Sequence, residues 1–198
     1  MNTLLLSILI PLTPDRIECA DRLEHEFWQQ AKDLLPHIEV IREIDNREMT
    51  IGEKRNILYA KANGAYSVQW DSDDFIHPQG LELIIGAILR QDYDCCTYEE
   101  HIDFDGKIQR SNHSLKYDDW QDNFDGFDFV RTPFMKSVIK TEIARSVPVP
   151  HIRYAEDHLW AQALKPHLKT EIHLNEQIYR YIHRKTPHNE RYGIEQTS

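Results

Sequence analysis

A short run of acids is the strongest chemical signal in the chain: Asp71, Asp73 and Asp74 follow Trp70, with Ser72 between the first two. Carboxylates this close together repel one another unless a cation neutralises them. Their hard oxygen atoms suit Mg²⁺ or Mn²⁺. Taken alone, such a run is more often an Asp-rich turn that caps the next helix, because short motifs match by chance. The run therefore indicates either a metal site or a helix cap.

A second pair of acids, Glu156-Asp157, opens a segment with helical spacing. Acids are favoured at a helix N-terminus by the helix dipole, so capping is the simpler interpretation. The functional interpretation makes Asp157 a general base. The dipole would lower its pKa and weaken it as a base, but it could still accept a proton while a new bond forms.

The third signal lies near the end of the chain. His183 could bind a metal or contact a phosphate, although a lone histidine in a mixed strand is usually only a tolerated polar residue. Arg180, Arg184 and Lys185 add local positive charge. Contact with an anion and a solvated basic face both remain open for this segment.

Other patterns are uninformative or exclude whole classes. Five aspartates between residues 118 and 128 have no EF-hand spacing, so we expect a solvated acidic loop there. The chain has no P-loop, no dinucleotide-binding GxGxxG and no GxSxG serine-hydrolase motif.

The first 90 residues predict three strand–helix units. The apolar run from Leu4 to Ile10, ending at Pro11, is typical of a strand buried on both faces. Thr13-Pro14 can start a helix that runs to about Leu35. A second strand then begins at His37 and ends near Asp45.

The next two units have clear boundaries. Thr50-Ile51-Gly52-Glu53 matches a capping box and predicts a helix to about Ala62. A third strand follows over residues 65–70, and Pro78 opens another helix. This alternation predicts an α/β fold with a parallel, doubly wound sheet, in which ligands bind beyond the carboxyl ends of the strands. The polar residues after the three strands should therefore gather at one edge.

The second half of the chain is less regular. Asp105-Gly106 predicts a tight hairpin. We expect further strands at 127–130, 172–174 and 178–182, and helices at 141–146 and 155–164. We interpret residues 1–198 as one domain, with a regular half over about 1–92 and a smaller, less regular half over about 93–198.

Composition limits the class of protein. The chain has 198 residues, 40% of them hydrophobic, so it can bury a core. With 23 Lys and Arg against 33 Asp and Glu, its net charge of −10 does not attract nucleic acid or anionic lipid, although a local basic groove remains possible. An odd number of cysteines, Cys19, Cys95 and Cys96, suggests a reducing compartment. The longest apolar run is too short to span a membrane, so we expect a cytoplasmic protein without stable membrane insertion.

Taken in order, these signals resemble the family-2 glycosyltransferases, which have the GT-A fold. The segment 7–11 resembles the opening strand of that family, and Asp45 lies where the family's second strand ends in an acid. Lys54-Arg55-Asn56 resembles the family's "RN" helix. The run at 71–74 looks like its DxD metal motif, 156–157 like its "ED" motif, and 181–183 like its late "Y.H" segment.

The resemblance implies a mostly parallel, Rossmann-like sheet flanked by helices, with a smaller acceptor half. It implies transfer of a sugar from a nucleotide diphosphate donor, most simply a UDP-sugar, with inversion at the anomeric carbon. Asp73 would bind Mn²⁺ or Mg²⁺ with help from His183. Asp71 and Ser72 would lie close to the ribose and the metal.

The remaining roles concern the base and the acceptor. Asp45, Arg55 and the backbone near Pro11 and Thr13 would hold the nucleoside. Asp157 would take the proton from the acceptor hydroxyl, and Glu156 would bind donor or acceptor hydroxyls. The interpretation requires that acids far apart in the sequence meet at one edge of the sheet.

Some alternatives remain open. A nucleotide-sugar-binding module without catalysis would show the same donor motifs. The second alternative is a nucleotidyltransferase. That class usually carries a Gly-rich loop after its first strand, and the absence of glycine from residues 11–16 argues against it. The first loop also departs from the family's usual "PTYNR". The acceptor could be a saccharide, a lipid-linked glycan, a protein side chain or a modified nucleic-acid base.

Overall fold

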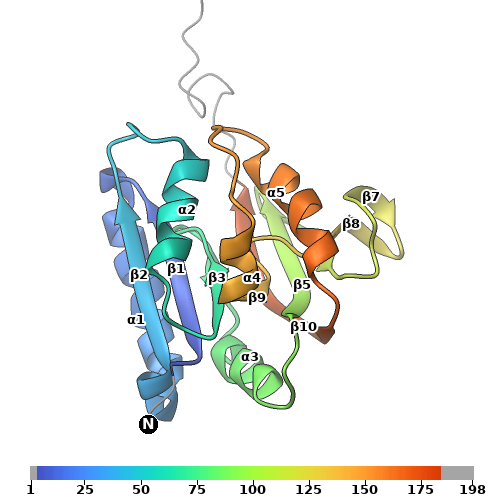
Figure 1. Cartoon of the computed structure of the whole chain (residues 1–198), viewed down its shortest axis with the longest axis horizontal. Helices are drawn as coiled ribbons and strands as arrows, with labels where there is room; N and C mark the ends of the chain where they lie inside the picture. The colour runs from blue at the N-terminus through green and yellow to red at the C-terminus, as the bar shows by residue number, and fades with distance from the viewer. Residues whose placement is uncertain (1–3, 184–198) are drawn as a thin grey trace, which may run out of the picture.

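The structure, a computed structural model, describes residues 4–183 (Figure 1). Its centre is β1 (Leu6–Leu12), which pairs in parallel with β2 (Ile38–Ile44) on one side and with β3 (Tyr66–Gln69) on the other. All residues of β1 are buried. This is the central strand that the apolar run predicts, although it ends one residue beyond Pro11.

Within the described residues, the strands form one ten-stranded sheet. Antiparallel β9 (Val138–Lys140) lies between β3 and β5 (Cys95–Phe104). β5 then pairs antiparallel with β6 (Lys107–His113) and in parallel with β10 (Glu171–His183). The remaining strands are β4 (Phe75–Ile76), β7 (Gln121–Phe124) and β8 (Phe127–Arg131). One sheet therefore runs from the regular half into the less regular half.

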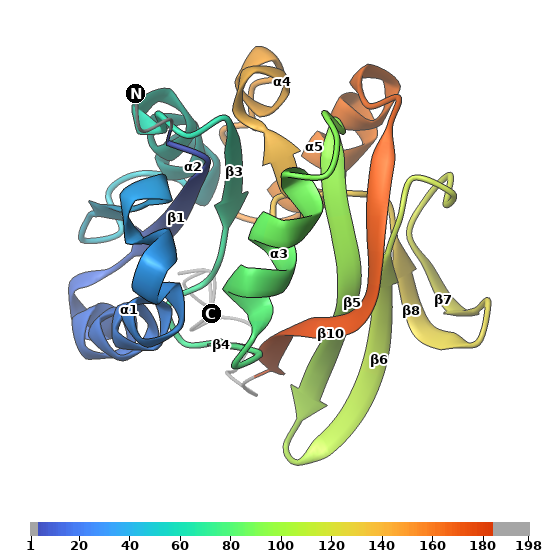
Figure 2. The same ribbon diagram turned by 90° about the horizontal axis from the view of Figure 1, so that it is seen from below.

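Helices cover both faces of the sheet. Figure 2 shows α1 (Ile17–Ala31) and α3 (Gly80–Ile88) on one side, and α2 (Ile51–Lys61), α4 (Thr141–Ser146) and α5 (Glu156–Leu164) on the other. Alternate residues of β1 serve the two cores: Ile8 and Ile10 pack with α1 and α3, whereas Leu9 packs with α2 and α5. This period of two is that of an extended strand. The α/β fold class expected from the sequence is confirmed.

The first helix departs from its predicted bounds at both ends. Residues Pro14–Arg16 form a 3₁₀ turn, and α1 begins only at Ile17. At the other end, Lys32 has a φ of 35°, which ends the α-helix, and Lys32–His37 continue as a 3₁₀ segment. The apolar spacing predicted one helix that runs to about Leu35, but the α-helix covers only the residues of α1.

Two Asp-Gly pairs form tight hairpin turns. Asp105 and Gly106 have φ values of 52° and 88°, and Asp125 and Gly126 have 55° and 81°. Positive φ at both central residues is the geometry of the turn that matches strand twist. The first hairpin was predicted, but the second was not, so the expected acidic loop contains β7 and the turn into β8. The two predicted C-terminal strands are one strand, β10, with an irregular register between Leu174 and Gln177.

The capping box that starts α2 is present. Thr50 Oγ1 accepts from the Glu53 amide at 3.2 Å, and the Glu53 carboxylate accepts from the Thr50 amide at 2.8 Å. Both bonds satisfy amides that the helix itself cannot pair.

We expect Thr50→Ala to lower the free energy of unfolding by about 1 kcal/mol, because it removes the cap. Urea denaturation measures this as a lower midpoint with an unchanged slope. Ser146→Ala, at an exposed hydroxyl in α4, is the control and should change stability by less than about 0.5 kcal/mol. Equal stability of Thr50→Ala and the parent protein would contradict the role of the cap.

Candidate active site at the carboxyl edge of the sheet

The acid run leaves the end of β3, and its three carboxylates differ in environment. Asp74 is fully buried: its carboxylate accepts from Tyr179 Oη at 2.5 Å and from the Ile182 amide at 2.8 Å. Burial raises the pKa of Asp74 to about 7, against the opposing effect of Lys136. Asp74 therefore joins the acid run to β10 and is a structural residue.

Asp71 is the most accessible of the three, with 28% of its side chain exposed. Its two oxygens face different cations, with Arg55 at 3.7 Å from Oδ1 and Lys136 at 3.6 Å from Oδ2. Burial opposes ionisation, but Lys136 and Arg55 hold the pKa of Asp71 below its usual range. Asp71 is therefore ionised at neutral pH.

Arg55 connects the acid run to the second acid pair. Its buried guanidinium lies 3.2 Å from the Glu156 carboxylate and donates to Gln69 Oε1 at 3.0 Å. Asp157 also attracts Arg55 electrostatically. Asp71, Glu156 and Asp157, which come from different halves of the chain, thus lie around one cation.

Asp73 lies two residues beyond Asp71 in the acid run. Its side chain is 7% exposed and forms an ion pair with the half-exposed Arg16 at 2.9 Å, and Arg16 also attracts Asp71. The neighbouring Ser72 is buried, and its hydroxyl has no hydrogen-bond partner among residues 4–183. The residues predicted to contact the ribose, Asp71 and Ser72, therefore lie in the same turn as Asp73, the predicted metal ligand.

The ends of β1 and β2 are tied together by Lys54 of α2. Its ammonium forms an ion pair with Asp45 and donates to the carbonyl of Leu12 at 2.6 Å. Burial disfavours the charge on Asp45, but Lys54 and the amide of Met49 hold its pKa below the usual range. Pro11, in β1, and Thr13, just beyond it, lie at this same edge.

The second acid pair begins α5. Glu156 is buried against Arg55, and burial raises its pKa. Asp157 is partly exposed, and its carboxylate accepts from the amide of His158 at 2.8 Å. Just before them, Ala155 has a φ of 61°, in the left-handed region that only glycine adopts at low cost.

α2 also positions the segment that leads into α5. Asn56 accepts from the amide of Val149 and donates to its carbonyl, each at 2.8 Å. A Cβ on Gly52 would lie 1.8 Å from the carbonyl oxygen of Pro150, so only glycine fits there. The helix that supplies Arg55 therefore also holds the backbone before Glu156.

His183 lies near the end of β10, where its ring centroid is 4.4 Å from that of Phe104. Among the described residues, no three His, Cys, Asp or Glu side chains are arranged to hold a metal ion. Asp73 and His183 thus do not belong to a three-ligand protein site. Any cation at Asp73 would need further ligands from elsewhere.

Sequence reasoning missed Arg16 and Lys136. Lys136 comes from the loop between β8 and β9, and its ammonium lies within 3.6 Å of three carboxylates. A lone lysine in a loop carries no motif, so no pattern in the sequence could have placed it. Arg16 was part of the first loop, but nothing indicated its pairing with Asp73.

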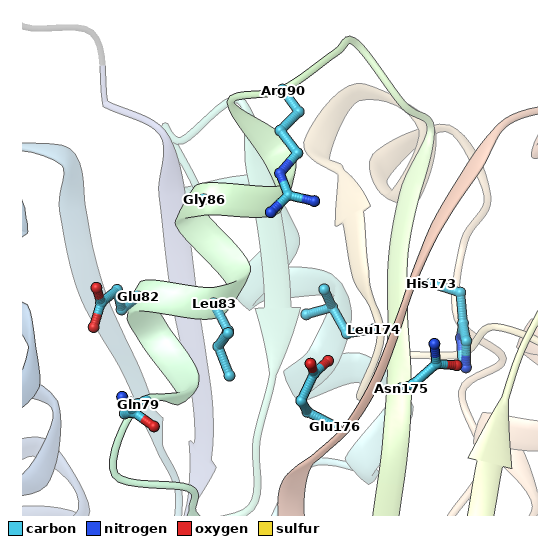
Figure 3. Close-up of a pocket in the computed structure, with 9 residues that line it drawn as sticks. All are labelled: Gln79, Glu82, Leu83, Gly86, Arg90, His173, Leu174, Asn175 and Glu176. Carbon is cyan, nitrogen blue, oxygen red and sulfur yellow. The ribbon is translucent and has the colours of Figure 1, made fainter.

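A surface hollow of about 500 Å³ lies away from these residues, between α3 and β10 (Figure 3). Glu82, Arg90, His173 and Glu176 are among the residues that line it. None of the predicted site residues lines the hollow, so it is not part of the candidate site.

Helices on both faces of the sheet and acids at the strand ends define a GT-A-type α/β protein, as the resemblance implied. Residues 21–147 match the family model of glycosyl transferase family 2. This segment is more than half of the chain, and the chain therefore belongs to that family. The predicted resemblance to the family-2 glycosyltransferases is confirmed.

Solved structures support the fold. The chain is similar to S. aureus TarS 1-349 in complex with UDP-GlcNAc, with a TM-score of 0.67, 14% identity, and coverage of 94% of this chain and 61% of that one. It is also similar to the complex of TarS 1-349 with UDP, with a TM-score of 0.65, 13% identity, and coverage of 91% and 61%. The chain thus spans about three fifths of these relatives.

No curated protein sequence matches the chain. Over residues 4–183, none of the helices combines the length and the apolar character that crossing a bilayer requires.

The left-handed conformation of Ala155 gives a testable prediction. Ala155→Gly should leave the melting temperature unchanged or raise it, because glycine adopts this conformation without a Cβ clash. The same change at the exposed Ala163, inside α5, should cost about 1 kcal/mol. Calorimetry distinguishes the two, and equal losses at both sites would show that Ala155 is not strained.

Proposed function

We propose that the chain is a metal-dependent, inverting glycosyltransferase that moves a sugar from a UDP-sugar to an acceptor hydroxyl. The observation that carries this proposal is the position of Arg55, which contacts both Asp71 and Glu156. Through Arg55, the acid run after β3 and the "ED" pair at the start of α5 meet at one edge of the sheet. Family membership and the UDP and UDP-GlcNAc complexes of TarS support the choice of donor.

The donor would bind across the carboxyl ends of β1, β2 and β3. Asp45 and the backbone near Pro11 and Thr13 would hold the base, with Arg55 close to the nucleoside. Asp71, which is ionised and partly exposed, can accept hydrogen bonds from ribose hydroxyls. The hydroxyl of Ser72 is buried without a partner among the described residues, so it can also serve a ligand there.

The transfer itself would be a single displacement. The acceptor oxygen attacks the anomeric carbon from the face opposite the leaving group, and the bond from that carbon to the diphosphate oxygen breaks. Asp157 takes the acceptor proton, and the nucleoside diphosphate leaves with the bonding electron pair. Glu156, fixed by Arg55, would bind a sugar hydroxyl of the donor or acceptor.

The charges of the site favour a divalent cation. Six carboxylates interact there with four basic side chains, so negative charge is in excess even when Asp74, whose pKa is about 7, is protonated. The acids are Asp71, Asp73, Asp74, Glu100, Glu156 and Asp157, and the cations are Arg16, Arg55, Arg131 and Lys136. A diphosphate brings further negative charge, so its binding needs a compensating cation.

The available ligands fit Mn²⁺ or Mg²⁺ that is held jointly with the donor. Mg²⁺ is usually bound by one or two carboxylates together with substrate phosphates. Asp73 would supply the carboxylate, and His183 is the second proposed ligand. Once bound, the ion would stabilise the charge that develops on the leaving diphosphate.

The proposed roles are divided between the two halves of the sequence. Residues of about 1–92 would bind the donor, and residues of about 93–198 would supply the base and the acceptor site, within a single domain. The continuous sheet, and the ion pairs of Arg55 with Glu156 and of Lys136 with Asp71, join the two halves and support a single domain.

Binding should require nucleotide and metal together. With Mn²⁺, UDP at about 100 times its Kd should raise the melting temperature by about 5–10 °C, whereas Mn²⁺ alone should have little effect. A panel of nucleotide-sugars, each with and without Mn²⁺, measures this by thermal shift and by release of free nucleotide. Equal stabilisation by UDP in EDTA would contradict the metal, and no response to any nucleotide would contradict the donor site.

The same panel separates the alternatives. A binding module without catalysis would be stabilised but would release no nucleotide, and a nucleotidyltransferase would turn over a nucleoside triphosphate with release of pyrophosphate.

Asp157→Asn should reduce the rate of transfer by about 10²–10⁴-fold, because it removes the proton acceptor. UDP affinity should change little, since Asp157 acts on the acceptor. Asp118→Asn, at a fully exposed side chain, is the matched control and should retain full activity. Near-normal transfer by Asp157→Asn would refute the assignment of the base.

A further inference from the structure

Lys136 occupies the centre of the acid cluster, although no motif includes it. Its ammonium lies 3.6 Å from Asp71 Oδ2, 3.6 Å from Asp74 Oδ2 and 3.4 Å from Glu100 Oε1. Only 11% of the side chain is exposed. The cation thus joins the acid run after β3 to β5 of the other half of the chain.

Aromatic rings enclose the same ammonium. It lies 4.7 Å from the ring centroid of Tyr179 and 4.0 Å from that of Tyr181, both in β10. Cations are attracted to ring faces at such distances. Burial alone would lower the pKa of Lys136, but the three carboxylates raise it well above its usual range. The side chain is therefore a permanent positive charge.

The backbone that carries Lys136 is fixed by the end of β3 and by β5. The carbonyl of Met135 accepts from the amide of Gln69 at 2.8 Å, and that of Lys136 accepts from the hydroxyl of Tyr98. Tyr98 in turn accepts from Trp70 Nε1 at 3.0 Å. These bonds set the position of the ammonium relative to the acid run.

Asp71 is held from both sides as a result. Arg55 faces one oxygen, Lys136 faces the other, and the Asp71 amide donates to Tyr179 Oη at 3.0 Å. If Lys136 were neutral, Asp71 would face the carboxylates of Asp74 and Glu100 without a cation between them. Repulsion would then turn Asp71 away from its present orientation.

We propose that Lys136 is a positioning residue of the donor site, which holds the Asp71 carboxylate in the orientation that accepts hydrogen bonds from the donor's ribose. This inference rests on the proposed function, because it takes the ligand of Asp71 to be a ribose. It assigns to a loop residue of the acceptor half a part in nucleotide recognition.

The test compares the affinities of UDP and 2′,3′-dideoxy-UDP, both with Mn²⁺, by titration calorimetry. A hydrogen bond to a charged group is strong, so the parent protein should prefer UDP by about tenfold or more. Lys136→Met should bind both nucleotides with affinities within about twofold of each other, because the ribose contact is lost. Lys136→Arg, which keeps the charge, should retain a preference for UDP.

Two further variants separate positioning from stability. Glu100→Gln combined with Lys136→Met removes one buried negative charge as well as the ammonium, so this double variant should fold, and it should also lose the preference for UDP. Lys140→Met is the matched control, because Lys140 pairs with two carboxylates, Asp92 and Asp94, outside the cluster. It should keep the full preference.

The possible failures are distinguishable. Equal weakening of both nucleotides, with the preference for UDP intact, would show that Lys136 has only a structural role and would overturn the proposal. A parent protein that binds both nucleotides equally would remove the ribose contact and the role of Lys136, but would leave the donor site standing. A parent protein that binds neither nucleotide would refute the proposed function itself.

Discussion

The buried guanidinium of Arg55 is the interaction on which the arrangement of the site depends. It lies between Asp71 and Glu156, which are separated by 85 positions in the sequence and belong to different halves of the chain. Breaking a buried ion pair by removing one partner typically costs about 3–5 kcal/mol, because the other charge stays buried without compensation. Neither acid can therefore leave its place cheaply while Arg55 remains.

The helix that carries Arg55 has several connections to its surroundings. Lys54 ties the end of β1 to Asp45 after β2, and Asn56 holds the backbone at Val149. Three consecutive side chains of α2 thus reach three different parts of the edge. The capping box at Thr50 starts this helix at a defined residue, so local sequence chemistry contributes to the geometry of the whole site.

The sequence predicted those features that local chemistry determines. The buried run of β1, the capping box of α2 and the first Asp-Gly hairpin each follow from a few neighbouring residues. The acids after β3 could be located because strand ends of a parallel sheet share an edge. The ends of α1 could not be predicted, because the apolar spacing continues past Lys32 whereas the α-helical conformation ends there. Lys136 could not either, because its partners meet it only in the tertiary fold.

The excess of negative charge at this edge connects structure to chemistry. Lys136 and Arg55 lie among the carboxylates inside the cluster, while Asp73 pairs with the half-exposed Arg16. The cation that pairs with Asp73 is thus more exposed to solvent than those inside the cluster. A cation that arrives with a diphosphate would offset the remaining negative charge there, which explains how acids can be concentrated in a site for an anionic ligand.

A crystal structure of the protein with UDP and Mn²⁺ tests the central claim most directly. The account predicts uracil beside the ends of β1 and β2, ribose at Asp71, and an anomalous manganese peak at Asp73 next to the diphosphate. Nucleotide bound elsewhere, such as in the hollow between α3 and β10, or manganese distant from Asp73, would contradict it.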